Sequence, residues 1–274
     1  MGALTRVTYP SRLRTSVADS PPLLSLRDVS KSFGGVQAVH DISFDVGAGE
    51  SVGLVGPNGA GKTTLFNCVC GQIRHDHGEV FFEGRPLEGL ATYKRARLGI
   101  GRTYQKVEMF TDMTVRDHLM VAARARQGSG RLWKDLLNMS KPTAAEVRKV
   151  DATMELVGIS PLADTSVDAL GLGHCRLVEL ARALAAEPKI LLADEPSSGL
   201  DIHETAEVAA VLRTVQRQRG TAILLVEHDL SLVSEVADRT VVMDLGAMLA
   251  QGTFDGVMAD PAVRRAYLGQ VGTT

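Results

Sequence analysis

Apolar and polar residues alternate along residues 24–45, as in the run AVHDISF at 38–44. A period of two is typical of strands that bury one face and expose the other. Gly34 and Gly35 interrupt the alternation, and a glycine pair between two strands predicts a turn. We therefore expect a small antiparallel sheet near the start of the chain.

Farther along, short apolar runs alternate with segments of helical spacing. The strand-like runs lie at 51–55, 189–193, 222–226 and 240–243. The segment 62–70 follows the first of them and predicts a helix. Strands that alternate with helices are typical of a parallel sheet covered by helices, so the pattern predicts an α/β fold.

Residues 106–165 differ from this rhythm, because 115–126 and 144–157 both carry helical spacing with a Gly/Ser break at 127–130 between them. We interpret the region as a helical insertion. Residues 1–22 show neither period and predict a flexible N-terminal extension. The expected organisation is an extension (1–22), a main domain (23–255) with core segments 23–105 and 166–255 around a helical subdomain (106–165), and a C-terminal tail (256–274).

Composition narrows the class of protein. The chain has 274 residues, of which 45% are apolar, and a formal net charge of -2, which is typical of a globular protein with no basic surface for nucleic acid. It has no apolar run near the roughly 20 residues of a spanning helix and no apolar block of a secretory signal, so we expect it in the cytoplasm. Cys68, Cys70 and Cys175 are too few for a disulfide framework and are predicted to be buried, inert thiols.

A glycine-rich stretch between the predicted strand 51–55 and the predicted helix 62–70 fills the pattern GxxxxGK[ST]. Backbone N–H groups of such a loop and the N-terminus of the following helix bind phosphate oxygens. We expect Lys62 to bridge the β and γ phosphates of a nucleotide and the Thr63 hydroxyl to help bind magnesium. The predicted nucleotide-binding residues are Gly56, Pro57, Asn58, Gly59, Ala60, Gly61, Lys62, Thr63 and Thr64.

Two adjacent acids, Asp194 and Glu195, end the apolar run at 189–193. Because side chains alternate along a strand, we expect the two carboxylates to play different roles. We assign Asp194 to magnesium and Glu195 to general base for the attacking water. The fold class is then an α/β P-loop NTPase core, mainly a parallel sheet with helices, plus a small antiparallel β subdomain and a helical insertion.

Together these motifs resemble the ATP-binding subunits of ABC transporters over nearly the whole stretch 23–269. The resemblance implies further roles at matching positions. Phe33 would stack on adenine, Gln105 would contact magnesium and the attacking water, and His228 would contact the γ phosphate. Asp201, in the run SGLD at 198–201, would belong to the loop that crosses to a second subunit.

The family's signature LSGGQ is where this chain departs from the pattern, since residues 170–174 are LGLGH. The resemblance implies that this segment opens a helix running toward Ala186 and caps the γ phosphate of ATP on the partner subunit, so Gly171, Gly173 and His174 are counted with the nucleotide-binding residues. The signature serine hydroxyl is absent, and we expect weaker closure of the dimer. His174 either donates to that phosphate or faces solvent.

Other details resemble the branched-chain amino acid uptake group, whose relatives also serve urea and short amides. They are RTYQ at 102–105, the lengthened insertion with RLWKDLL at 131–137, and RAYLG at 265–269. The resemblance implies an ATP-hydrolysing subunit on the cytoplasmic face of the membrane. It implies as partners a second ATP-binding subunit, transmembrane permeases and, indirectly, an extracytoplasmic solute-binding protein, with ATP and Mg²⁺ as cofactors.

Alternatives stay open at this point. The degenerate signature is compatible with a regulatory or weakly hydrolysing ATP-binding protein, or with the degenerate partner of a heterodimer. The apolar face at 132–137 either docks on a permease or packs on its own domain. The run His75-Asp76-His77 has metal-ligand spacing, but its polar surroundings favour a solvated loop.

Overall fold

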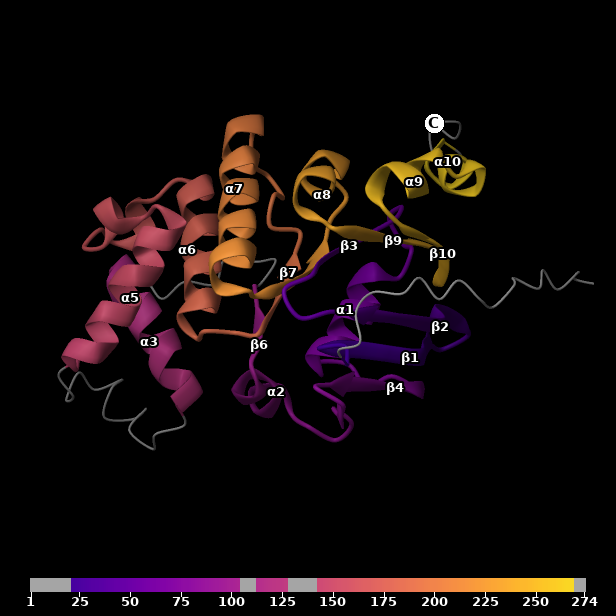
Figure 1. Ribbon diagram of the computed structural model, residues 1–274, viewed down its shortest axis with the longest axis horizontal. Coiled ribbons are helices and arrows are strands. Elements are labelled where there is room, and N and C mark those ends of the chain that lie inside the picture. The colour runs from indigo at the N-terminus through magenta and orange to yellow at the C-terminus, as the bar shows by residue number, and fades with distance from the viewer. Residues whose placement is uncertain (1–20, 104–111, 128–141, 269–274) are drawn as a thin grey trace, which may run out of the picture.

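The structure is a computed structural model that describes residues 21–103, 112–127 and 142–268 (Figure 1). Its strands are β1 (Leu24–Phe33), β2 (Val36–Val46), β3 (Ser51–Val55), β4 (His77–Phe82), β5 (Arg85–Pro86), β6 (Ile100–Arg102), β7 (Ile190–Asp194), β8 (Ala222–Val226), β9 (Arg239–Asp244) and β10 (Ala247–Gly252). Its α-helices are α1 (Lys62–Cys70), α2 (Thr92–Leu98), α3 (Val115–Gln127), α5 (Ala144–Val157), α6 (Leu172–Ala185), α7 (Ile202–Arg219), α8 (Leu230–Val236), α9 (Phe254–Ala259) and α10 (Pro261–Leu268).

The first strands form the small antiparallel sheet expected from their alternation. Its order is β2-β1-β4-β5. Strands β1 and β2 join through Gly34, whose φ of 57° lies in the left-handed region that glycine adopts at little cost. Their register pairs Leu24 with Val46 and Phe33 with Val36, so the hairpin prediction is confirmed.

The second sheet has six strands in the order β10-β9-β3-β8-β7-β6. Strands β9, β3, β8, β7 and β6 run parallel, and β10 pairs antiparallel with β9. The α/β prediction is therefore confirmed. Because β3, β8 and β7 are parallel neighbours, the residues that follow their carboxyl ends meet at one edge of the sheet, where ligands of such folds bind.

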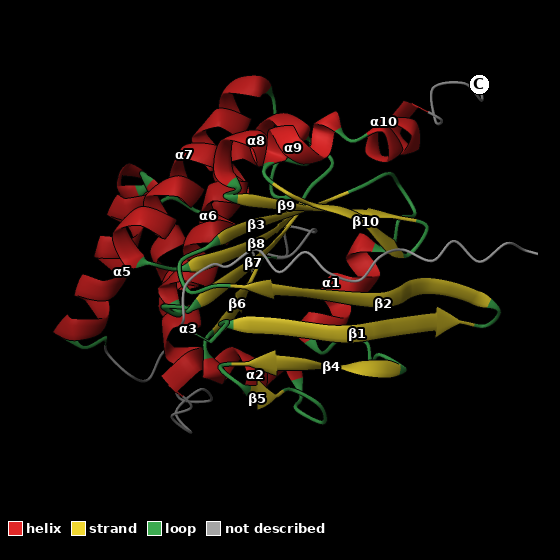
Figure 2. Ribbon diagram, turned by 45° about the vertical axis from the view of Figure 1, so that its right-hand side comes forward, coloured by secondary structure: helices red, strands yellow, loops and turns green. Residues whose placement is uncertain are grey.

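The two faces of the second sheet bury different cores. In β7, Ile190 and Leu192 belong to one apolar cluster with α1 and the antiparallel sheet, whereas Leu191 and Ala193 belong to another with α6, α7 and α8. This division follows from the alternation of side chains along a strand. Figure 2 shows α1 lying between the two sheets. Helix α1 is therefore covered on both sides, and its N-terminus is fixed at the sheet edge.

Helices α3 and α5 stand with α6 at one end of the molecule (Figure 1). Helix α5 begins with a capping box in which Thr143 accepts from the Glu146 backbone and the Glu146 side chain accepts from Thr143. The predicted helices 115–126 and 144–157 are confirmed, the first ending one residue later. The predicted apolar face at 132–137 lies outside the described residues.

The carboxyl end of α1 is bound by a buried guanidinium. Arg95, in α2, donates to the carbonyls of Cys68 (3.0 Å) and Val69 (2.7 Å). It also donates to the carbonyls of Leu87 (2.9 Å) and Leu90 (3.1 Å). Helix α1 has no basic residue in its own last turn. A cation from another helix therefore binds two of the terminal carbonyl groups of α1 and opposes its negative terminal dipole.

The proposed limits 1–22, 23–255 and 256–274 remain predictions. Strand β1 begins at Leu24, next to the expected start, and the expected limit between 255 and 256 falls inside α9. Within the described part of the chain, no helix is both long and apolar enough to cross a membrane.

Candidate active site

The glycine-rich loop 56–61 connects β3 to α1 and packs against backbone from both sheets. Gly56 has a φ of 153°, and a β-carbon there would lie 2.1 Å from the Met243 carbonyl oxygen. Gly61 has a φ of 95°, and a β-carbon there would lie 2.1 Å from the Ala38 carbonyl oxygen. Glycine is therefore required at both positions by close backbone contact as well as by conformation. Gly59, in contrast, has open space around its α-carbon.

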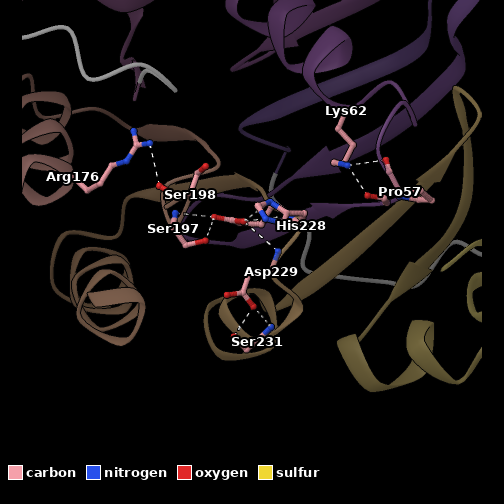
Figure 3. Close-up of polar contacts among 10 residues, drawn as sticks. Pro57, Lys62, Arg176, Ser197, Ser198, His228, Asp229 and Ser231 are labelled. Carbon is pink, nitrogen blue, oxygen red and sulfur yellow. Dashed lines mark hydrogen bonds and ion pairs between the residues drawn. The ribbon is translucent and has the colours of Figure 1, made fainter. Parts of the chain in front are cut away.

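Lys62 is the first residue of α1 and is only 6% exposed. Its ammonium group donates to the carbonyl oxygens of Gly56 (2.5 Å) and Pro57 (3.0 Å), as Figure 3 shows. Burial lowers the pKa of Lys62, while the acids Glu195, Glu227 and Asp194 oppose that shift. The loop thus binds the buried Lys62 ammonium group, which also attracts three nearby carboxylates. Around it Asn58 and Thr63 are exposed, Thr64 is half-buried and Ala60 is buried.

Asp194 is the last residue of β7 and is 3% exposed. Its backbone N–H donates to the Thr103 hydroxyl at 3.2 Å. Its Oδ1 atom is buried and has no hydrogen-bond partner in the described part of the chain. Burial raises the pKa of Asp194 to about 6 against the attraction of Arg102, and Glu195 and Glu227 raise it further. The buried negative charge of Asp194 is therefore only partly balanced, and a bound cation would lower its cost.

Glu195 stands just beyond the strand and has a φ of 47°, in the left-handed region. Its N–H donates to the Val226 carbonyl at 2.8 Å, and its carbonyl accepts from Ser198 N–H at 3.1 Å. Strand alternation does not extend to Glu195, because β7 ends at Asp194, and the different roles expected of the two carboxylates stay a prediction. Glu195 shares its left-handed backbone with other non-glycine residues of this chain, such as Asp41 and Glu83, so this conformation alone does not mark it as catalytic.

Glu227 and His228 follow the neighbouring strand β8. The His228 side chain is 56% exposed, and its Nδ1 lies 3.6 Å from a carboxylate oxygen of Glu227, which is fully buried. The sequence analysis did not foresee a place for Glu227. The available signal was its position, since it follows an apolar strand just as Asp194 ends the adjacent one. Figure 3 shows His228 and Lys62 on the same edge of the sheet.

Asp201, expected to bind nucleotide as part of a loop that reaches a second subunit, is the N-cap of α7. Its carboxylate accepts from His203 N–H (2.8 Å) and Glu204 N–H (2.9 Å), and Glu204 accepts in return from Asp201 N–H (3.1 Å). These contacts lower the pKa of Asp201. The spacing D-x-x-E at 201–204 is a capping-box signal that the sequence already carried.

The segment 170–174 opens α6, which begins at Leu172 with Gly171 as its N-cap. His174 is exposed, whereas Gly173 is buried. A β-carbon on Gly173 would lie 2.4 Å from the Glu204 carboxylate, so the side chain of α7 already fills the space a larger residue would need. Leu172 is 45% exposed at the surface beside it. The segment therefore presents a helix N-terminus, one imidazole and one apolar side chain outward.

The remaining expected residues are spread more widely. Phe33 ends β1 and is 48% exposed. The Lys31 ammonium lies over its ring, 5.3 Å from the centroid, so Lys31 covers part of one face. Gln105 lies outside the described residues. Arg102, three residues before it, has a guanidinium nitrogen 3.9 Å from the Asp194 carboxylate and 3.3 Å from the Asn67 side-chain oxygen.

The cysteines and the run 75–77 are the other groups with candidate chemistry. Cys68 and Cys70 are buried as predicted, and burial raises the pKa of Cys68 to about 11 and of Cys70 to about 12. The prediction that Cys175 is buried is wrong, because this residue of α6 is half-buried; burial raises its pKa as well. The expected solvated loop at 75–77 is in part structured, because exposed Asp76 binds Lys31 (2.7 Å) and the Ser32 N–H (2.8 Å). Across the described ranges, no group of three His, Cys, Asp or Glu residues is placed to hold a metal.

Comparison with known families agrees with this geometry. The family described as "ABC transporter" matches residues 39–198. A second family, "Branched-chain amino acid ATP-binding cassette transporter", matches residues 247–272. The chain is 38% identical over 254 residues, 92% of this chain and 99% of the relative, to the high-affinity branched-chain amino acid transport ATP-binding protein LivG of Salmonella typhimurium.

Other relatives are more varied. The branched-chain amino acid transport protein BraF of Pseudomonas aeruginosa is 34% identical over 92% of this chain and 99% of its own. The lipopolysaccharide export system ATP-binding protein LptB of Haemophilus influenzae is 36% identical over 90% of this chain and 98% of its own. Among solved structures, an ATP-binding cassette of an ABC transporter in its ADP conformation superposes with a TM-score of 0.79 at 28% identity, covering 91% of this chain and 100% of that one.

Proposed function

Since the chain belongs to the ABC transporter family and is an ATP-hydrolysing subunit, we propose that it energises uptake of branched-chain amino acids, or of small polar solutes such as urea and amides, through a separate permease. Support comes from LivG and BraF, which match over 92% of the chain. Overall identity does not separate uptake from export, because the export-system protein LptB is about as similar as LivG and BraF. The match of residues 247–272 to the branched-chain amino acid family favours uptake.

The observation that carries the catalytic part of the proposal is the meeting of Lys62, Asp194 and Glu195 at one sheet edge. The acids are close enough to Lys62 to oppose the fall in its pKa. We assign Lys62 and the loop 56–61 to the phosphates, because buried N–H donors and an ammonium bind anions strongly where water is excluded. Glu195 would take the proton of the attacking water, and exposed His228 would donate to the γ phosphate.

Magnesium fits the same edge. The buried and unpartnered Oδ1 of Asp194 is a hard oxygen ligand that lacks a positive partner. Asp194, the exposed Thr63 hydroxyl and Gln105 would hold the ion, leaving other positions to phosphate oxygens and water. When bound, Mg²⁺ would neutralise charge on the phosphates.

Subunits of this family work in pairs and with membrane permeases. For this chain we propose a peripheral position on the cytoplasmic face and a head-to-tail dimer in which Gly171, Gly173 and His174 cap ATP bound to the partner. Phe33 would stack on adenine, since half of its surface is accessible. The missing signature serine keeps a second candidate function, a weakly hydrolysing or degenerate member of a heterodimer.

A groove of about 490 Å³ supplies a place for a permease segment. It lies between α2 with β6 and the α3–α6 pair, and it is lined among others by Tyr93, Arg97, Arg102 and Arg182. Tyr93 is 58% exposed, whereas Arg102 reaches toward Asp194 at 3.9 Å. A segment bound in this groove would therefore contact a residue that also faces the nucleotide site.

Two measurements test the proposal. Purified protein should retain labelled ATP only with an intact loop, so Lys62→Ala should lose binding that the exposed-surface control Lys94→Ala keeps. Cells expressing Glu195→Gln in place of the native chain should lose uptake of labelled leucine or urea. Unchanged ATP retention by Lys62→Ala contradicts the phosphate site. Unchanged uptake of all these solutes by the Glu195→Gln cells contradicts the transport role, whereas full turnover of a homodimer without any partner excludes the degenerate alternative.

A further inference from the structure

Glu227 is a fully buried carboxylate to which the roles above give no task. It directly follows β8, and its carboxylate binds both the loop after β7, which carries the labelled Ser197 in Figure 3, and its own loop after β8. Its Oε1 accepts from the Ser197 backbone N–H at 3.0 Å and from the Ser197 hydroxyl at 2.7 Å. This end of the carboxylate therefore holds the loop that follows Glu195.

The other oxygen of Glu227 holds the loop that carries His228. Oε2 accepts from the backbone N–H groups of His228 (3.1 Å) and Asp229 (3.3 Å). The Nδ1 atom of His228 is 3.6 Å from the same oxygen. Asp229 in turn accepts from Ser231 N–H at 2.8 Å and caps α8. The histidine loop is thus fixed between a helix cap and one buried acid.

The loop after β7 is bound from its far side as well. The Arg176 guanidinium, in α6, donates to the Ser198 carbonyl at 3.4 Å. Ser198 N–H donates to the Glu195 carbonyl at 3.1 Å. Polar contacts on the consecutive residues Ser197 and Ser198 therefore connect α6 and the Glu195 backbone to Glu227, which in turn binds the His228 loop.

We propose that Glu227 is a positioning residue that fixes Glu195 and His228 relative to each other during ATP hydrolysis. The inference rests on the proposed roles of those two residues. Four N–H or O–H donors point at the two oxygens of Glu227, and only an ionised carboxylate accepts at both ends. Glutamine has one accepting oxygen and one donating NH₂ group. In Glu227→Gln the NH₂ group would therefore oppose the N–H donors of one of the two loops. Lys62 from α1 and Asp194 from β7 are the other charged groups whose pKa values respond to Glu227.

The test is a double-mutant cycle on steady-state ATPase activity with Mg-ATP. Glu227→Gln alone should lower kcat by about 10- to 100-fold, the range for losing a hydrogen bond to a charged group, without raising KM for ATP. In a His228→Ala background the same substitution should lower kcat by no more than about twofold, because residues that act as one unit are not additive. A purely structural role would lower stability and leave the two kcat effects additive.

Glu146→Gln is the matched control, because Glu146 is also a carboxylate that accepts from a side chain and from backbone, but in α5. It should lower the melting temperature and leave kcat unchanged. If Glu227→Gln fails to fold, Ser197→Ala removes a single hydroxyl donor and takes its place in the cycle with His228→Ala.

The outcomes separate the two levels of the proposal. If His228→Ala alone keeps full turnover, the catalytic role of His228 is wrong and the positioning inference falls with it. If His228→Ala lowers turnover and the Glu227→Gln or Ser197→Ala effect is additive with it, only the positioning inference is overturned. A rise in KM without a fall in kcat also overturns it.

Discussion

A guanidinium nitrogen of Arg102 lies 3.9 Å from a carboxylate oxygen of Asp194. This distance is longer than a hydrogen bond, so the arginine attracts the acid without satisfying it. The second oxygen of Asp194 is buried and unpartnered in the described part of the chain. The protein therefore holds a carboxylate that costs stability when ionised, which is typical of a group kept for function rather than for folding.

The first prediction concerns Asp194→Asn. The folded-state pKa of Asp194, about 6, lies above its ordinary value of 3.8. A raised carboxyl pKa favours the folded state at low pH, and this stability is lost as the pH rises through 6. Without nucleotide or Mg²⁺, Asp194→Asn should raise the free energy of unfolding at pH 8 by about 1–3 kcal/mol and change it little at pH 4.

Urea denaturation at the two pH values measures this difference. Asp255→Asn, at an exposed position in α9, is the control and should show no comparable pH dependence. A variant that is less stable than the native protein at pH 8 would contradict the cost assigned to the buried charge.

Glu195→Gln should separate binding from turnover. Loss of a positioned base lowers the rate by about 10²- to 10⁴-fold. The substitution leaves Lys62 and the loop unchanged, and these are the proposed phosphate ligands, so ATP retention should persist and an ATP-dependent dimer should accumulate. Size-exclusion chromatography with ATP and Mg²⁺ measures the dimer. A variant that remains monomeric under these conditions counts against the proposed closure.

Glu146→Gln should show acid-dependent destabilisation. The Arg124 guanidinium and the Thr143 backbone lower the pKa of Glu146 to about 2. The stabilisation is present above the ordinary carboxyl pKa near 4.5 and is lost as the pH falls toward 2. We expect the variant to be about 1 kcal/mol less stable at pH 7, with the difference shrinking by pH 3.

Chemical denaturation at both pH values checks this trend. Glu187→Gln, whose side chain is 57% exposed beside Lys149, is the comparison and should change stability less. A difference that grows as the pH falls would have the wrong sign for a lowered pKa.

Asp201 distinguishes a helix cap from a nucleotide ligand. Asp201→Ala should cost about 1 kcal/mol of stability, whereas Asp201→Ser retains a capping oxygen and should cost less. If Asp201 acts only as a cap, Asp201→Ser keeps normal affinity for ATP and normal turnover. If both variants lose turnover equally while Asp201→Ser keeps its stability, the carboxylate has the intersubunit role that the family resemblance implies.

Much of the fold could be predicted because its signals are local. Helix 62–70 lies between glycines that adopt left-handed backbone on both sides, and the bounds of α1 agree with the prediction. Strand 222–226 is an uninterrupted apolar run and is confirmed without change. Strands β6 and β10 were not predicted. Strand β6 has three residues, and β10 carries half-buried positions without clear alternation, so pairing with neighbours defines them.

The site was harder to predict because tertiary contacts decide it. The sequence shows that acids end a strand at Asp194 and follow another at Glu227, but their burial depends on how β7 and β8 pair. The left-handed backbone of Glu195 likewise has no sequence signal, since glutamate is not among the residue types that favour this region. Motif spacing identifies which residues meet, whereas packing determines which of them are charged, strained or already bound.

The Arg95 guanidinium binds the end of α1 that is opposite the proposed phosphate site. Phosphate would bind at the first turn of that helix, and Arg95 binds carbonyls at the last, about 13 Å away for nine residues. Helix α1 would then have a negative phosphate at its positive N-terminal end and the positive Arg95 at its negative C-terminal end, and both charges would stabilise the helix dipole. Lysine has one ammonium group and no planar guanidinium, so Arg95→Lys would leave some of these carbonyls without a donor. The C-terminal end of α1 would become less rigid, and with it the helix whose N-terminus is proposed to bind phosphate.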